Sequence, residues 1–221
     1  MKSVVLLSSG LDSTVNFCKA LREGAVVCAL TFDYGQKAAA SEILHAKLIA
    51  KQYGVRHEVV DLQWLKPLTQ TALVQAEVDL PQLKTSELDD LTKTKQSARQ
   101  VWVPNRNGVF IQIAASFAEA LGAQSVVVGF NGEEAKTFPD NSASFVALVN
   151  QGLQFSTLSN VQVVCYTLAY NKKKIVQLGR ELKAPFDLMW SCYQSGMQGC
   201  GRCESCLRYE RAMKGRSDER V

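Results

Sequence analysis

The chain has 221 residues, of which 47% are hydrophobic and 21% are charged. This composition is typical of a globular protein and excludes a disordered chain, a collagen-like repeat and a coiled coil. The formal net charge is +4, a mild excess that is typical of a solvated surface and makes nucleic-acid binding unlikely. A chain of this length buries about 70% of its unfolded surface, so it can form a core without disulfides or metal ions.

The first residues of the chain do not resemble a targeting segment. The apolar run ends at residue 7, and no stretch of about 18 apolar residues follows it. We therefore expect a cytoplasmic protein that makes no contact with membranes. Because cytoplasmic thiols stay reduced, the seven cysteines are not interpreted as a disulfide framework.

Apolar runs alternate with helically spaced apolar residues along most of the chain. In chain order, we predict a strand at 3–7, a helix at 12–22, a strand at 26–32, a helix at 38–53 and a strand at 58–62. The alternation resumes with a helix at 106–121, a strand at 125–129, a helix at 142–155, a strand at 161–166 and a helix at 171–182. This order predicts an α/β fold with a parallel five-stranded sheet, and the apolar strands indicate burial on both faces.

Residues 63–104 interrupt the alternation. The stretch is polar, contains Asp89 and Asp90 together with many lysine, threonine and glutamine residues, and shows weak periodicity. An insertion of this length without regular structure is uncommon in a compact domain unless it is a lid or another functional loop. We expect a mobile insertion that passes over the binding site.

The loop after the first strand is a candidate binding site, because parallel α/β sheets bind ligands at the carboxyl ends of their strands. It reads Ser8-Ser9-Gly10-Leu11-Asp12-Ser13-Thr14. Small residues allow successive N–H groups to point at an anion, and the start of the next helix adds partial positive charge. The loop therefore predicts phosphate binding, with an ordinary strand-to-helix turn as the alternative. We expect Asp12 to hold Mg²⁺ or to cap the helix.

Four of the cysteines lie close together near the carboxyl end: Cys192, Cys200, Cys203 and Cys206. Four thiolates in a glycine-rich loop satisfy a tetrahedral Zn²⁺ ion with no open position, which is the structural kind of zinc site. We therefore predict a zinc-binding segment at residues 190–210. An iron–sulfur cluster is the alternative, although the C-x3-C-P element that often accompanies it is absent.

Segments along the whole chain resemble one family. The first loop is similar to the SGGxDS pyrophosphate loop of the N-type ATP pyrophosphatases, with Ser9 in place of the first glycine. The further similar segments are 32–37 (FDYGQK), 103–107 (VPNRN), 138–140 (FPD), 171–172 (NK) and the four-cysteine loop. Together they resemble the 7-cyano-7-deazaguanine synthase family. The resemblance implies a single domain over residues 1–221, a Rossmann-like fold of the adenine nucleotide alpha hydrolase type, and a homodimer.

The reaction implied by the resemblance is an ATP-dependent C–N ligation in queuosine biosynthesis. ATP activates the carboxylate of 7-carboxy-7-deazaguanine as an adenylate, and ammonia displaces the activated group to give an amide. A further activation at the amide oxygen permits loss of water, which gives the nitrile 7-cyano-7-deazaguanine. ATP, Mg²⁺ and Zn²⁺ are the cofactors that the resemblance implies.

The resemblance also implies roles for individual residues. The pyrophosphate of ATP and Mg²⁺ are held by Ser8, Ser9, Gly10, Leu11, Asp12, Ser13 and Thr14. Asp33 and Gln36 face the nucleotide or its ribose, with a turn cap as the alternative for Asp33. Asp12, Ser13, Arg106 and Lys172 form the catalytic set. In this set, Arg106 and Lys172 neutralise phosphate or the substrate carboxylate, and for each the alternative is an ordinary cation on the surface.

Two departures from the family pattern affect the loop and the expected substrate pocket. If the position of Ser9 requires a positive φ, serine costs about 1 kcal/mol there. The family segment D-x-S-G-Y-P-D-C-R-x-E-F corresponds to residues 134–145, where Asn141, Ser142 and Ser144 replace its cysteine, arginine and glutamate. The loss of the arginine and the glutamate removes strong, directional hydrogen-bond partners from the expected substrate pocket. The alternatives are a divergent paralogue with another carboxylate or amine substrate, a tRNA-thiolating pyrophosphatase, and a non-catalytic module that binds nucleotide and zinc.

Overall fold

A parallel five-stranded sheet forms the centre of the computed structural model, which describes residues 1–215. The strands lie in the order β3-β2-β1-β4-β5, and every neighbouring pair is parallel. Their bounds are β1 Lys2–Leu6, β2 Ala25–Asp33, β3 His57–Asp61, β4 Ser125–Val127 and β5 Gln162–Val164. The predicted α/β fold with five parallel strands is confirmed. The order changes direction at β1 and β4, and such a point is where these sheets bind ligands.

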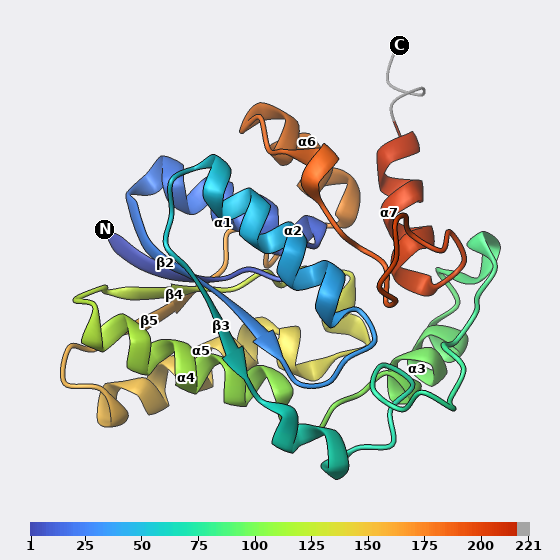
Figure 1. Ribbon diagram of the computed structural model, residues 1–221, viewed down its shortest axis with the longest axis horizontal. Helices are drawn as coiled ribbons and strands as arrows, with labels where there is room; N and C mark the ends of the chain where they lie inside the picture. The colour runs from blue at the N-terminus through green and yellow to red at the C-terminus, as the bar shows by residue number, and fades with distance from the viewer. Residues whose placement is uncertain (216–221) are drawn as a thin grey trace.

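Helices cover both faces of the sheet (Figure 1). One face carries α1 (Leu11–Glu23) and α2 (Ala39–Gln52), and α6 (Lys172–Glu181) packs beside α1. The opposite face carries α4 (Arg106–Ala120) and α5 (Ala143–Ser156). Asn171 caps α6 as predicted, since its side chain accepts a hydrogen bond from the Lys174 N–H.

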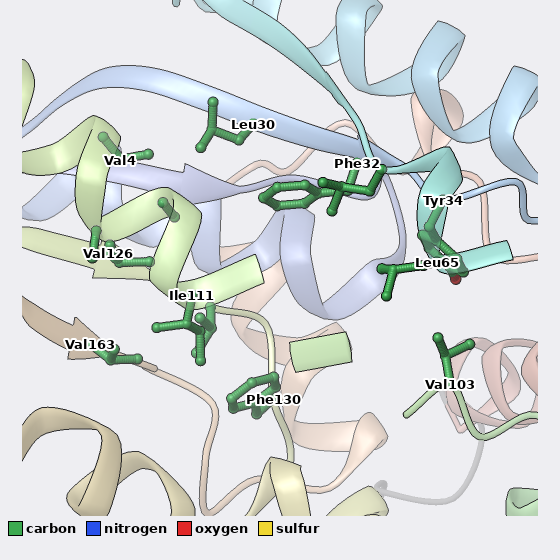
Figure 2. Packing of buried hydrophobic residues seen from close by; sticks show 14 of the residues in the cluster. Val4, Leu30, Phe32, Tyr34, Leu65, Val103, Ile111, Val126, Phe130 and Val163 are labelled. Carbon is green, nitrogen blue, oxygen red and sulfur yellow. The ribbon is translucent and has the colours of Figure 1, made fainter. Parts of the chain in front are cut away.

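Alternating strand residues supply the two cores. Val4 and Val126 pack with Ile111 on the face of α4, and Figure 2 shows these side chains around the sheet. Val5 and Val127, one residue further along each strand, pack on the opposite face with the helices α1 and α6. All four valines are fully buried. This two-sided burial explains why the strands read as unbroken apolar runs.

The last two strands are shorter than predicted. We expected strands at 125–129 and 161–166, whereas β4 and β5 have three residues each. The Val128 N–H still donates to the Val164 carbonyl of β5, and beyond it the chain leaves the sheet and passes the amino end of α1. A Cβ atom at Gly129 would lie 2.6 Å from the Ser13 nitrogen. Close packing against the first loop therefore takes precedence over the β-propensity of the sequence.

The insertion at residues 63–104 contains regular structure that the sequence did not predict. Its helix α3 (Leu91–Gln100) starts at Asp90, whose carboxylate accepts the N–H groups of Thr92 and Lys93. The helix buries only Thr94, Ser97 and Ala98. Such a narrow stripe of small residues does not produce the helical spacing of apolar residues from which a helix is predicted. The motion predicted for the insertion stays a prediction.

A second unpredicted helix, α7 (Glu204–Lys214), closes the described chain. It packs on α6, and its Arg211 forms an ion pair with Asp89 of the insertion at 2.9 Å. The Glu204 carboxylate accepts a hydrogen bond from Ser97 of α3. The insertion is therefore attached to the carboxyl-terminal segment. Within residues 1–215, no helix combines the length and the apolar character needed to cross a membrane.

Candidate active site

A large cavity opens at the carboxyl ends of β1, β2 and β4. It brings together residues from both ends of the chain. The lining includes Ser8, Gly10, Asp12, Ser13, Phe32, Arg106, Phe110, Gly129, Glu134, Lys172, Trp190, Tyr193, Glu204 and Arg208. All four members of the predicted catalytic set, Asp12, Ser13, Arg106 and Lys172, belong to it.

The first loop has the tight backbone that the family motif requires. Ser9 has φ of 61°, in the left-handed region where glycine is favoured. Its hydroxyl donates to the Ser8 carbonyl at 2.5 Å, and its side chain is fully buried. Ser13 ties the turn together, because its hydroxyl contacts the Ser8 hydroxyl at 3.1 Å and donates to the Gly10 carbonyl at 3.1 Å. Serine therefore occupies the glycine position with strain that its hydroxyl partly offsets.

The loop contains polar groups that the described residues leave without partners, and Leu11, Asp12 and Ser13 line the cavity whereas Thr14 does not. The backbone N–H groups of Leu11, Asp12 and Ser13 find no acceptor in residues 1–215, as expected for the first turn of a helix. Two buried side-chain oxygens, Oδ1 of Asp12 and Oγ1 of Thr14, also lack partners in the described chain. Buried polar groups are normally satisfied. Free N–H donors beside an unpaired carboxylate oxygen fit a phosphate group together with its metal ion.

Asp12 of the first loop and Lys172 at the start of α6 form a buried ion pair in the cavity lining. Their side chains are 12% and 13% exposed, and Lys172 also pairs with Glu134 at 2.7 Å. Burial raises the pKa of Asp12 to about 6 despite the neighbouring ammonium. Burial opposes the charge of Lys172 as well, but the two carboxylates hold its pKa above the ordinary value. Lys172 and Glu134 thus join the Asp12 carboxylate of the first loop in one charged cluster.

Asn131 is a site residue that the sequence reasoning missed. It is fully buried, and its amide donates to Asp12 Oδ2 at 3.0 Å. Its side-chain oxygen accepts the N–H groups of Glu133 and Glu134 at 3.0 and 2.9 Å. Asn131 therefore fixes one oxygen of Asp12 and the turn that carries Glu134. Its position just beyond β4, at the carboxyl edge of the sheet, is the signal that could have found it.

Arg106 begins α4 and lies at the far wall of the cavity. Its guanidinium donates to the Tyr34 hydroxyl at 3.1 Å and lies 5.7 Å from the centroid of that ring. The preceding Asn105 has φ of 51°, a left-handed conformation that asparagine adopts more readily than most other residues. A Cβ at Gly108 would meet the Asn105 side chain, so Gly108 leaves room for the asparagine.

Asp33 and Gln36 have local partners in the turn after β2. Asp33 Oδ1 accepts the Gly35 N–H and the Gln63 amide, each at 3.0 Å. Gln36 is 5% exposed, accepts the Tyr34 N–H and donates to Glu42. Neither residue belongs to the cavity lining. Their predicted contact with a nucleotide stays untested, and the turn-cap alternative for Asp33 describes its contacts.

The four cysteines converge on one point. Their Sγ atoms all lie within 4.8 Å of one another. A tetrahedral ion with metal–sulfur bonds of about 2.3 Å requires sulfurs about 3.8 Å apart, so the donor set fits one such ion. Backbone N–H groups of Gln194 and Cys200 each donate to Cys192 Sγ at 3.4 Å. Gly201 provides the positive φ of 69° with which the chain doubles back.

The cysteine loop is attached directly to the first loop. The backbone N–H of Trp190 donates to the Ser9 carbonyl at 3.0 Å, and its indole N–H donates to the Gln194 carbonyl at 3.1 Å. Cys203 caps α7, whose first turns contribute Glu204 and Arg208 to the cavity. The four-cysteine cluster therefore shapes one wall of the cavity.

Comparison with known proteins shows the family. The family model described as queuosine biosynthesis protein QueC matches residues 2–216. This chain belongs to the QueC family. A protein of Carboxydothermus hydrogenoformans named 7-cyano-7-deazaguanine synthase is 52% identical, over 97% of this chain and 99% of that protein. The protein of the same name from Pelotomaculum thermopropionicum is 53% identical over 97% of each chain. The family resemblance stated above is confirmed.

Similarity to solved structures is more distant. The NMN synthetase of Francisella tularensis is 16% identical with a TM-score of 0.48, and the match covers 90% of this chain and 70% of that one. A 4-thiouridine synthetase in complex with RNA and ATP is 19% identical with a TM-score of 0.48, covering 96% of this chain and 50% of that one.

The strained position of Ser9 gives a testable stability difference. Ser9→Gly relieves the left-handed backbone strain and is expected to raise the free energy of unfolding by up to about 1 kcal/mol. Ser9→Ala keeps the backbone strain and removes the hydrogen bond of the hydroxyl group, so it is expected to lower the free energy of unfolding by about 1 kcal/mol. Urea denaturation of both variants measures this. Equal stability of the two variants would contradict the strained loop.

Proposed function

We propose that this protein is an ATP-dependent ligase that converts 7-carboxy-7-deazaguanine and ammonia into 7-cyano-7-deazaguanine. Relatives named 7-cyano-7-deazaguanine synthase match nearly the whole chain. The observation that carries the proposal is the first loop, where Leu11, Asp12 and Ser13 line the cavity, their N–H groups have no acceptor in residues 1–215, and Oδ1 of Asp12 is buried without a partner. That arrangement suits a reaction in which pyrophosphate leaves.

The first half of the proposed reaction activates the carboxylate. A carboxylate oxygen is a poor leaving group, so the acid must be activated before an amine can replace that oxygen. One substrate oxygen attacks the α-phosphorus of ATP, the bond to the β-phosphate oxygen breaks, and pyrophosphate leaves. The N–H groups of Leu11, Asp12 and Ser13 stabilise the charge on the departing pyrophosphate. Lys172 exchanges a carboxylate partner for a phosphate oxygen.

Ammonia completes the first half and prepares the second. Its nitrogen attacks the acyl carbon, AMP leaves with the original carboxylate oxygen, and one proton is released to give the neutral amide. The amide oxygen then attacks a second ATP in the same way. The adenylated amide releases one N–H proton to give a neutral imidate, and loss of AMP together with the second N–H proton forms the C≡N bond. No protein nucleophile is required in either half.

Two metal ions belong to this proposal. Asp12, whose Oδ1 is unpaired, and Thr14 would hold Mg²⁺, which supplies charge neutralisation of the triphosphate. The four cysteines would hold Zn²⁺ as a structural ion, with the four sulfurs as its complete ligand set. Because these ligands must be thiolates, the proposal places the protein in the reducing cytoplasm. A homodimer is also proposed, and light scattering would then give twice the 24.3 kDa chain mass.

The substrate assignment is tested by incubation of the protein with 7-carboxy-7-deazaguanine, ATP, Mg²⁺ and ammonium, followed by mass spectrometry. The expected products are the amide, then the nitrile, with two AMP released per nitrile. Residues 134–145 differ from the family segment, and the competing proposal is therefore that the protein activates another carboxylic acid. Untouched ATP and acid would contradict the assignment.

The role of Asp12 is tested by Asp12→Asn, which keeps the shape of the side chain. ATP consumption is expected to fall by at least about 1,000-fold, since the variant loses a charged ligand at the reacting centre. The melting temperature at pH 8 is expected to stay close to that of the wild type, because the loss of one partner of Lys172, which keeps Glu134, is offset by removal of a carboxylate whose ionisation burial disfavours. Asp187→Asn, at an exposed residue, is the matched control. Undiminished ATP turnover in Asp12→Asn would refute the role.

The metal assignment predicts a colourless protein with one zinc per chain. Cys203→Ser should lose the zinc, and hydrogen exchange should accelerate in residues 190–214 while β1 stays protected. Cys165→Ser, at a cysteine outside the cluster, should retain the metal. Elemental analysis and visible absorption provide the readouts. A brown protein with a broad visible band would indicate an iron–sulfur cluster instead.

A further inference from the structure

A carboxylate without a role in the proposed reaction, Glu42, also lines the active-site cavity. It lies in the first turn of α2. Its Oε2 atom accepts a hydrogen bond from the Gln36 amide at 2.8 Å, whereas its Oε1 atom accepts none from residues 1–215. The fully buried side-chain atoms without partners in that part of the chain belong to Asp12 and Thr14. Oε1 of Glu42 is therefore open to the cavity.

Glu42 is held in a fixed orientation. Gln36, which contacts it, is itself buried, donates to the Phe32 carbonyl at 3.0 Å and accepts the Tyr34 N–H at 3.0 Å. The neighbouring Ser41 anchors the start of α2 to the cysteine loop, since its hydroxyl accepts the Gly196 N–H at 3.1 Å. A side chain held this firmly is preorganised to recognise a ligand.

The hydrogen-bond donor Arg106 and the aromatic rings of Phe32 and Phe110 line the same cavity as Glu42. Burial raises the pKa of the Glu42 carboxyl, and the Gln36 hydrogen bond and the Arg106 charge oppose that rise. No hydrogen bond in the described chain joins Glu42 to Arg106. The rings of Phe32 and Phe110, stacked at 4.1 Å, line the cavity beside them. An acceptor, a donor and an aromatic surface are the elements that recognise a planar heterocycle.

We propose that Glu42 recognises the pyrimidine edge of the deazaguanine ring through hydrogen bonds. Its carboxylate accepts the ring N1–H and the exocyclic 2-amino group, while Arg106 donates to the adjacent ring carbonyl oxygen. This role rests on the proposed function and adds the residue that sets substrate specificity. The adenine of ATP fits the same carboxylate less well, because its edge presents one amino donor beside a ring nitrogen whose lone pair repels the carboxylate.

The test compares two substrates in Glu42→Gln, which has the same shape and lacks the charge. The substrates are 7-carboxy-7-deazaguanine and its analogue without the 2-amino group. The wild-type protein is expected to prefer the first by at least about 100-fold in kcat/KM, because loss of the amino group leaves a buried acceptor unpaired. In Glu42→Gln this preference should fall below about 10-fold, with KM for ATP within about 3-fold of wild type. Glu23→Gln, at the exposed end of α1, is the matched control and should behave as wild type.

The outcomes separate this proposal from the proposed function. An unchanged preference in Glu42→Gln overturns the proposal and leaves the ligase function intact. A raised KM for ATP with an unchanged KM for the acid overturns it as well, because Glu42 would then face adenine. A wild-type protein that turns over neither acid overturns the ligase function, and the proposal falls with it.

Discussion

Asp12 and Lys172 are 160 positions apart in the chain, yet their side chains form a buried ion pair at one edge of the sheet. The pair requires α1 and α6 to begin at the same place, and parallel strands provide this because their carboxyl ends share one edge. Asn131, in the turn after β4, donates a hydrogen bond to the Asp12 carboxylate, and Glu134 forms an ion pair with Lys172. The first loop, the turn after β4 and the start of α6 thus form one charged unit.

This unit is built at the expense of local stability. Ser9 has a strained backbone, burial raises the pKa of Asp12, and two buried oxygens have no partner in the described chain. Such features cluster at functional sites, where a ligand supplies the missing partners. Triphosphate and a cation would satisfy the free N–H groups and the Asp12 oxygen together. The cysteine loop supports the unit from outside, because Trp190 donates to the Ser9 carbonyl.

The sequence was most informative where one physical signal dominates. Apolar runs marked the central strands β1, β2 and β4 because both faces of the sheet are buried there. Ser9, at the glycine position of the family motif, has the positive φ that was considered for it. The helix α3 was missed because its buried stripe is narrow. Asn131 and Glu42 were missed because the direction of a side chain depends on neighbours distant in sequence. Asp33, the last residue of β2, and Gln36 have hydrogen-bond partners within the protein, and their predicted contact with a nucleotide stays a prediction.

The central claim is that a substrate carboxylate oxygen attacks the α-phosphorus of ATP at the first loop. The most direct test uses 7-carboxy-7-deazaguanine with ¹⁸O in both carboxylate positions, and mass spectrometry of the nucleotide product. Each AMP is expected to carry one ¹⁸O atom, because the first activation removes one carboxylate oxygen and the second removes the other. Unlabelled AMP, or ADP with inorganic phosphate, would contradict the claim.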